Sequence, residues 1–117
     1  MQGELMEPLD WNALKENCAG DESLVNEVLE LFRKESAGLL GDVREAVTAR
    51  DAVAVKKAAH RLKGALVSLG AAPSVAAARE LEKAGMESAP ARFDPGYQVL
   101  EVEMARLMSA ISVAHAA

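Results

Sequence analysis

His60 is the residue of this chain whose side chain could carry chemistry by itself. Lys57 precedes it by three residues and Gly64 follows it by four, so all three share one face of a predicted helix. An imidazole that is largely neutral near neutral pH can attack phosphorus, although many isolated surface histidines have no such role. The cations Lys57, Arg61 and Lys63 would attract the oxygens of a bound phosphoryl group. The histidine and these three cations together predict that His60 is a phosphoacceptor.

Gly64 makes this interpretation sharper. Glycine inside a helix costs about 1 kcal/mol relative to alanine, so its presence needs a reason. The missing side chain would leave a notch beside His60 through which another protein could approach the ring. A close helix crossing is the other interpretation, but helical spacing puts Gly64 on the outward face. Val53 and Val67 lie on the same outward stripe and would add a small apolar docking surface.

The helix that positions His60 is predicted to begin after Asp51 and to end at Gly70. Aspartate is a favoured N-cap, and glycine commonly ends helices. Its inward stripe comprises Val55, Ala59, Leu62, Leu66 and Leu69. At about 100° per residue, His60 lies nearly opposite this stripe and faces water.

Apolar periodicity predicts a second long helix on the N-terminal side of this one. It begins after Asp21, and Gly38 and Gly41 mark a place where it could kink or break. Its stripe comprises Val25, Val28, Phe32, Leu39, Val43 and Ala46. A short helix over residues 11–17 is expected to cover one end of the molecule.

On the C-terminal side, a helix is predicted to begin at Pro73 and to stop near Gly85. Its apolar residues are Val75, Ala78 and Leu81. The stretch 87–96 contains two prolines and is expected to be the longest loop. A last stripe comprises Phe93, Tyr97, Leu100, Met104, Leu107, Ile111 and Ala114. With no strand pattern, the fold class is all-α: an antiparallel four-helix bundle with a short additional N-terminal helix.

The 117 residues, half of them apolar, suffice for one domain. We expect a flexible leader at residues 1–7 and the bundle at 8–117. No apolar run approaches the roughly 20 residues of a membrane span, and no secretory signal is visible. The single cysteine, Cys18, excludes an internal disulfide and a Cys-rich zinc site, and it fits a reducing, cytoplasmic setting. Nucleotide-binding glycine motifs are absent from the sequence.

Charge is unevenly distributed along the chain. The net charge is −5, which argues against general nucleic-acid binding. Residues 50–63 nevertheless contain five lysines and arginines and a single carboxylate, Asp51. Such a basic island suits one anionic group or an acidic pocket on a partner protein better than a long polyanion, although a solvated helix face would look similar.

The run AHRLKG at residues 59–64, followed by Gly70-Ala71, resembles the motif of histidine-containing phosphotransfer (HPt) domains. That motif is His-x-Leu-Lys-Gly, followed after five residues by Gly-Ala. Gly20-Asp21, Asp51 and Leu81-Glu82 also sit where the family places similar residues. One departure follows Gly64, where the family often has small polar residues and this chain has Ala65 and Leu66. Leu66 belongs to the inward stripe, so we interpret this departure as a change in the core that leaves the phosphoacceptor assignment of His60 intact.

The resemblance implies a phosphorelay intermediate. His60 would accept a phosphoryl group from a receiver-domain aspartate and pass it to an aspartate of another receiver. By this resemblance Lys63 would hold the phosphoryl oxygens and Gly64 would admit the receiver. Lys57 and Arg61 are added to the predicted binding residues because of their charge and their position near His60, not because of the resemblance. The receiver would supply the magnesium ion, so the carrier needs no cofactor. The expected partners are response-regulator receivers and a hybrid sensor histidine kinase, of which the chain could be a module. We expect the carrier to be a cytoplasmic monomer that inserts in no membrane.

Three alternatives remain at this stage. A helical adaptor could bind a receiver or kinase without phosphotransfer, although His60, Lys63 and Gly64 are all intact. A dimerising histidine-kinase domain usually has an acidic residue beside its histidine, whereas Arg61 follows His60. A metal-binding bundle would need several inward glutamates and histidines, which the stripes lack.

Overall fold

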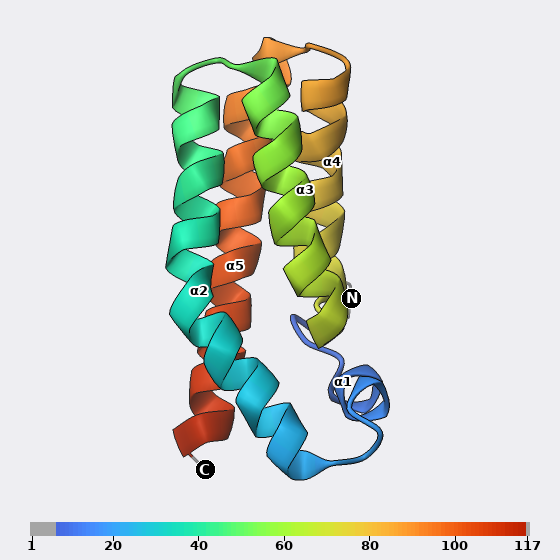
Figure 1. Ribbon diagram of the computed structural model, residues 1–117. Coiled ribbons are helices and arrows are strands. Elements are labelled where there is room, and N and C mark those ends of the chain that lie inside the picture. The colour runs from blue at the N-terminus through green and yellow to red at the C-terminus, as the bar shows by residue number, and fades with distance from the viewer. Residues whose placement is uncertain (1–6, 117) are drawn as a thin grey trace, which may run out of the picture.

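The structure, a computed structural model, describes residues 7–116, with side chains as far as Val113. Within these residues the elements are α1 (Trp11–Asn17), α2 (Glu22–Thr48), α3 (Ala52–Leu69), α4 (Ala72–Met86), the 3-10 turn η1 (Pro90–Arg92) and α5 (Phe93–Ala116), with no strand. Helices α2 to α5 run antiparallel in chain order, and α1 lies at one end (Figure 1). The predicted all-α fold is confirmed. Apart from Glu7, the expected leader falls outside the described residues.

Local capping sets the ends of α2 and α3 as predicted. The side chain of Asp21 accepts a hydrogen bond from the backbone N–H of Leu24 at 3.2 Å, and that of Asp51 accepts one from Ala54 at 3.1 Å. Each bond satisfies a donor that the first helical turn leaves without a partner. Gly70 ends α3 with φ 72°, a left-handed conformation that glycine adopts without strain.

The loop expected at residues 87–96 is shorter than predicted. Helix α4 begins at Ala72, one residue before Pro73, and ends at Met86, and α5 already begins at Phe93 with η1 before it. Pro95 is thus the third residue of α5 rather than a loop residue. The first turn of a helix tolerates proline because its N–H groups have no intrahelical acceptor.

Helix α2 runs without a break from Glu22 to Thr48, so the break considered at Gly38 and Gly41 does not occur. The helix does change direction along its length, and its N-terminal part slants toward the end where α1 lies (Figure 1). Helix α2 also packs beside α3, and Arg61 of α3 contacts Asp42 of α2.

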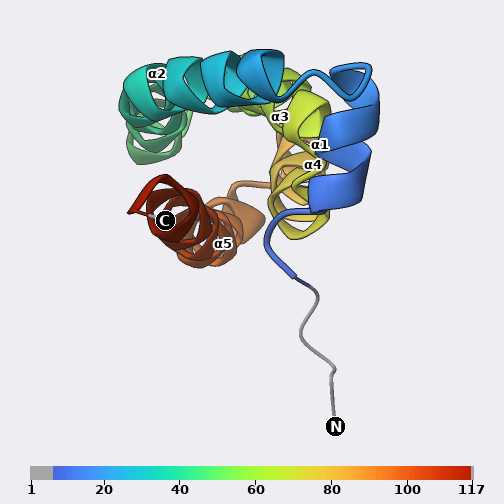
Figure 2. The same ribbon diagram turned by 90° about the horizontal axis from the view of Figure 1, so that it is seen from below.

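The core lies along the predicted stripes. The five inward residues of α3 are at most 1% exposed, and the α5 stripe is buried at Phe93, Leu100, Met104, Leu107 and Ile111. Leu29 of α2, 2% exposed, is a core residue absent from the predicted stripe. Helix α1 closes the end of the bundle beside α3 (Figure 2), where the N–H of Asp10 donates to the carbonyl of Gly70 at 2.9 Å. The buried inner face of α3 holds this helix in place, and its outer face, which carries His60, is thereby turned toward solvent.

Candidate functional site

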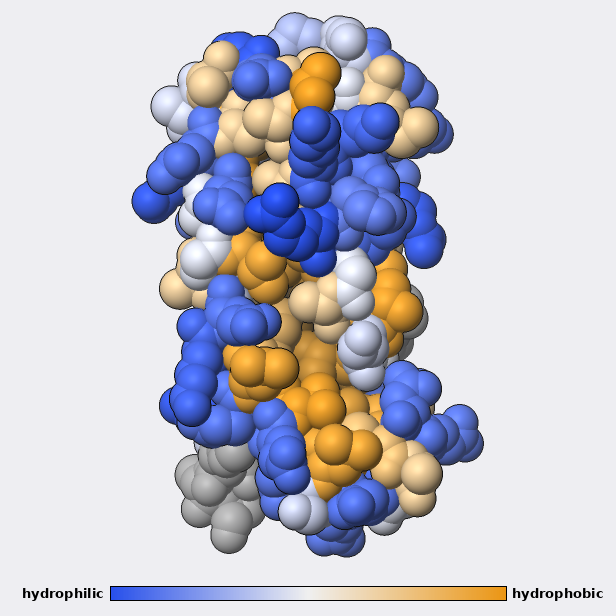
Figure 3. Space-filling model, in the orientation of Figure 1, coloured by the Kyte–Doolittle hydropathy of each residue, from blue (hydrophilic) through white to orange (hydrophobic). Residues whose placement is uncertain are grey.

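The outer face of α3 is as exposed as predicted. Val53 and Val67 are 61% and 54% exposed, and His60 and Gly64 lie between them, both exposed. In Figure 3 hydrophilic side chains cover the upper part of α3, and apolar side chains gather below them, between α2 and α3. A partner approaching this side would therefore meet charged and apolar surface together.

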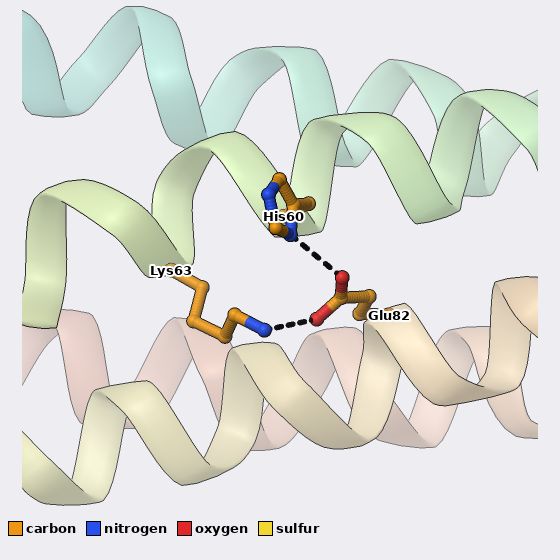
Figure 4. Close-up of polar contacts among 3 residues, drawn as sticks. All are labelled: His60, Lys63 and Glu82. Atoms are coloured by element: carbon orange, nitrogen blue, oxygen red, sulfur yellow. Dashed lines mark hydrogen bonds and ion pairs between the residues drawn. The ribbon is translucent and has the colours of Figure 1, made fainter.

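His60 contacts a carboxylate that comes from the next helix. Its Nδ1 lies 2.7 Å from Oε2 of Glu82 on α4, and the His60 side chain is 68% exposed whereas that of Glu82 is 12% exposed. Figure 4 shows the ring edge bearing Nδ1 turned toward Glu82. The second ring nitrogen, Nε2, has no hydrogen-bond partner among the described residues. The ring is thus held at one nitrogen and open at the other.

Lys63 binds the other oxygen of the same carboxylate. Its Nζ donates to Oε1 of Glu82 at 2.6 Å, and its side chain is 22% exposed (Figure 4). Burial by itself would raise the pKa of Glu82. The hydrogen bonds from Lys63 and His60, together with their charges, outweigh burial and hold that pKa below its ordinary value of 4.5. Glu82 is therefore an ionised carboxylate at neutral pH.

Gly64 lies at an open surface. A Cβ atom built there would meet no atom within 4 Å outside its own stretch of helix. The close helix crossing considered as the alternative is therefore wrong, because such a crossing would put backbone atoms beside this position. Since Gly64 follows His60 by one turn, the surface of α3 on that side of the imidazole carries no side chain.

The two remaining cations occupy different surroundings. Arg61 points toward α2, where its Nη1 lies 3.5 Å from Oδ2 of Asp42, and both side chains are more than half exposed. Lys57 is exposed and has no ion pair within the described part of the chain. The structure thus brings His60 and Lys63 together at Glu82, leaves Lys57 on the open face, and directs Arg61 to the other side of α3.

Glu82 is the site residue that the sequence reasoning left without a role. No carboxylate lies one turn from His60 on its own helix, but the antiparallel neighbour supplies one. Helices α3 and α4 approach closely because Gly85, one turn after Glu82, packs on the backbone of Ala52 and Lys56. The signals available were the Leu81-Glu82 pair named in the resemblance and the small residues of α4, which permit such an approach.

Two other kinds of site are not found in the described residues. No group of three or more histidine, cysteine, aspartate or glutamate side chains among them could hold a metal ion. None of their helices is both long and apolar enough to cross a membrane.

Comparisons with known proteins bear on the fold and the family of the chain. A search of curated proteins found no matching sequence. A structure of the HPt domain of a sensor hybrid histidine kinase from Shewanella superposes with a TM-score of 0.81 at 18% identity, covering 92% of this chain and 93% of that one; at this identity the match shows the fold. The sequence profile of the Hpt domain matches residues 27–113. The chain therefore belongs to the Hpt domain family, whose members are histidine phosphocarrier modules of phosphorelays rather than classical enzymes.

Proposed function

We propose that this protein carries a phosphoryl group on Nε2 of His60, between the aspartates of two receiver domains. The observation that supports this role is the arrangement of the ring: Nδ1 is held by Glu82, whereas Nε2 is open on a 68% exposed side chain. The bare position at Gly64 lets a partner's active site reach that nitrogen. A nucleophile that must enter another protein's site needs such access.

Phosphoryl transfer by this route exchanges one bond for another. The lone pair of Nε2 forms the N–P bond while the bond between phosphorus and the receiver's aspartyl oxygen breaks, and its electron pair returns to that carboxylate. We assign the magnesium ion to the receiver's acidic pocket, where it would neutralise the phosphoryl oxygens.

Charge supports an acidic partner pocket. Lys57 faces solvent one turn before His60, whereas Lys63 is paired with Glu82 and Arg61 points toward Asp42 of α2. Lys57 is thus the cation of the open face that would complement the carboxylates and the phosphoryl group that a receiver brings to the interface. A receiver belonging to a hybrid sensor kinase would be a natural donor, and a second receiver the acceptor.

The test is phosphotransfer from a panel of receiver domains, each labelled with radioactive acetyl phosphate. Wild-type protein should gain a label that is stable to base and labile to acid, and His60→Gln should gain none while melting at the same temperature. His115→Gln is the matched control, because His115 is the other histidine of the chain. Label on His60→Gln would contradict the assignment. Receiver binding without any label would favour the adaptor instead.

A further inference from the structure

Arg79 of α4 is an exposed cation that the site described above does not use. It precedes Glu82 by three residues, so the two side chains lie one turn apart on neighbouring faces of α4. The buried residues of α4, Leu81 and Ala78 among them, lie on the other side of the helix. Among the described residues, the Arg79 guanidinium has no ion pair and no side-chain hydrogen bond. Its five donors are therefore available to a ligand.

The antiparallel packing of α3 and α4 places Arg79 on the C-terminal side of His60. Glu82 contacts both His60 and Lys63, which sets the register of the two helices at this level. Three residues toward the N-terminus of α4 cover about 4.5 Å along its axis, in the direction in which α3 runs toward its C-terminus. Arg79 is therefore level with the turn of α3 from Lys63 to Gly64.

The open nitrogen of His60 is directed to the same side. Figure 4 shows Nε2 on the ring edge nearer Lys63, away from the contact with Glu82. Gly64 contributes no side chain to this surface, and a Cβ atom built there would meet no neighbouring atom within 4 Å. A phosphoryl group on Nε2 would therefore project over this bare turn of α3, on the side where Arg79 lies.

The other cations near His60 have different surroundings. The Lys63 side chain is 22% exposed, and its Nζ donates to the neighbouring carboxylate at 2.6 Å. Arg61 is directed toward α2. Lys57 precedes the histidine by one turn, so it lies on the side of the ring away from Nε2. Arg79 is thus the unpaired cation on the side to which the phosphoryl group would project.

We propose that Arg79 binds the phosphoryl group of phosphorylated His60, with its guanidinium donating to the phosphoryl oxygens across the bare turn at Gly64. The planar fork of donors in arginine matches two oxygens of such a group. The inference rests on the proposed function and deepens it by naming a residue that holds the cargo after the receiver has left. Since only the phosphorylated carrier gains this contact, Arg79 shifts the phosphoryl group from receiver to carrier at equilibrium.

The test is a ³¹P NMR titration of protein phosphorylated with phosphoramidate, from which ammonia leaves as Nε2 of His60 forms the N–P bond. A cation beside the phosphoryl group favours its dianion and so lowers the pKa of that group. Arg79→Gln should therefore raise the phosphoryl pKa. It should also lower the equilibrium constant for transfer from a receiver to the carrier by roughly three-fold to ten-fold, as expected for one charge-assisted hydrogen bond.

Two variants separate a local contact from a change in net charge. Arg33→Gln removes the same charge from an exposed position of α2. Arg33 precedes Asp42, the residue beside Arg61, by nine residues or about 13 Å of helix, which exceeds the screening length of about 8 Å at physiological salt. This variant should titrate like the wild type. Arg79→Lys keeps the charge without the fork, so it should keep the low phosphoryl pKa and lose part of the equilibrium effect.

Equal phosphoryl pKa values and equal transfer equilibria in wild type and Arg79→Gln would overturn the inference. An equal change in Arg33→Gln would also overturn it, because the effect would then reflect net charge alone. Either result can occur while receivers label His60 only, which leaves the proposed function intact. Label on His60→Gln from a phosphorylated receiver would instead overturn the proposed function, whereas the titration needs no receiver. Unchanged melting temperatures should show that all variants fold.

Discussion

Gly64 and Gly85 lie on adjacent helices in opposite surroundings. A Cβ atom at Gly64 would find no neighbour within 4 Å, whereas one at Gly85 would lie 2.7 Å from the backbone nitrogen of Lys56 and 2.8 Å from the carbonyl oxygen of Ala52. Packing therefore explains Gly85 and does not explain Gly64. The two glycines form a matched pair for separating stability from access.

Replacing Gly64 by glutamine should raise the stability and impair the function. Glutamine is the better helix former by several tenths of a kcal/mol, and its Cβ atom would meet no neighbouring atom within 4 Å. The same side chain would fill the bare surface beside His60 and obstruct a receiver. We expect an equal or higher melting temperature with much slower phosphotransfer. A destabilised variant, or a stable one with normal transfer, would refute the access role.

Replacing Gly85 by alanine should have the reverse effect on stability. The added methyl group would press on α3 backbone that cannot move aside easily, at a cost of about 1–3 kcal/mol. Urea unfolding of this variant beside Gly64→Ala measures the contrast. Equal stability of the two alanine variants would mean that α3 and α4 are not closely packed at this crossing.

Replacing Lys63 by alanine should slow phosphotransfer roughly ten-fold without abolishing it, because Lys63 supports the histidine but is not the nucleophile. The loss of its ion pair with the poorly exposed Glu82 should also lower the unfolding free energy by about 1 kcal/mol. Lys57→Ala is the control, since Lys57 is exposed and its removal should leave stability unchanged. A loss as complete as that of His60→Gln would show that this account of Lys63 is wrong.

Local signals account for the part of the fold that could be predicted. The helix over residues 11–17, the aspartate caps and the left-handed Gly70 each depend on a few adjacent residues, and all were found where expected. The same local reasoning failed at Pro95, because proline is common both in loops and in the first turn of a helix. Residue types alone cannot distinguish these two settings, because the distinction depends on where the next helix begins, which is Phe93 here.

The contact between His60 and Glu82 shows a different limit. The two residues are 22 positions apart, and their meeting depends on the register of α3 against α4. That register is set by how closely the helices pack at Gly85, which periodicity within one helix does not reveal. Exposure of His60 could be predicted because it is a property of one helix, but its partner could not.

Acid should weaken the fold through Glu82 in a definite pH range. Its pKa in the folded protein lies below the ordinary value of 4.5, so the folded state favours the ionised form. Its contribution to stability is thus fully present above that ordinary value, and is lost as the pH falls through the lower folded value. Urea unfolding of wild type and Glu82→Gln at a series of pH values should show a difference that shrinks over this range.

Glu87 provides the control for that measurement. Its pKa is also lowered, chiefly by the hydrogen bond from Arg92, but that pair is exposed on the surface, with side-chain exposures of 49% and 43%. Solvent screens such pairs, so Glu87→Gln should change the unfolding free energy little at any pH. If Glu87→Gln showed the same pH-dependent loss as Glu82→Gln, the loss would reflect general charge removal. A loss confined to Glu82→Gln would tie acid sensitivity to the carboxylate that holds His60 and Lys63.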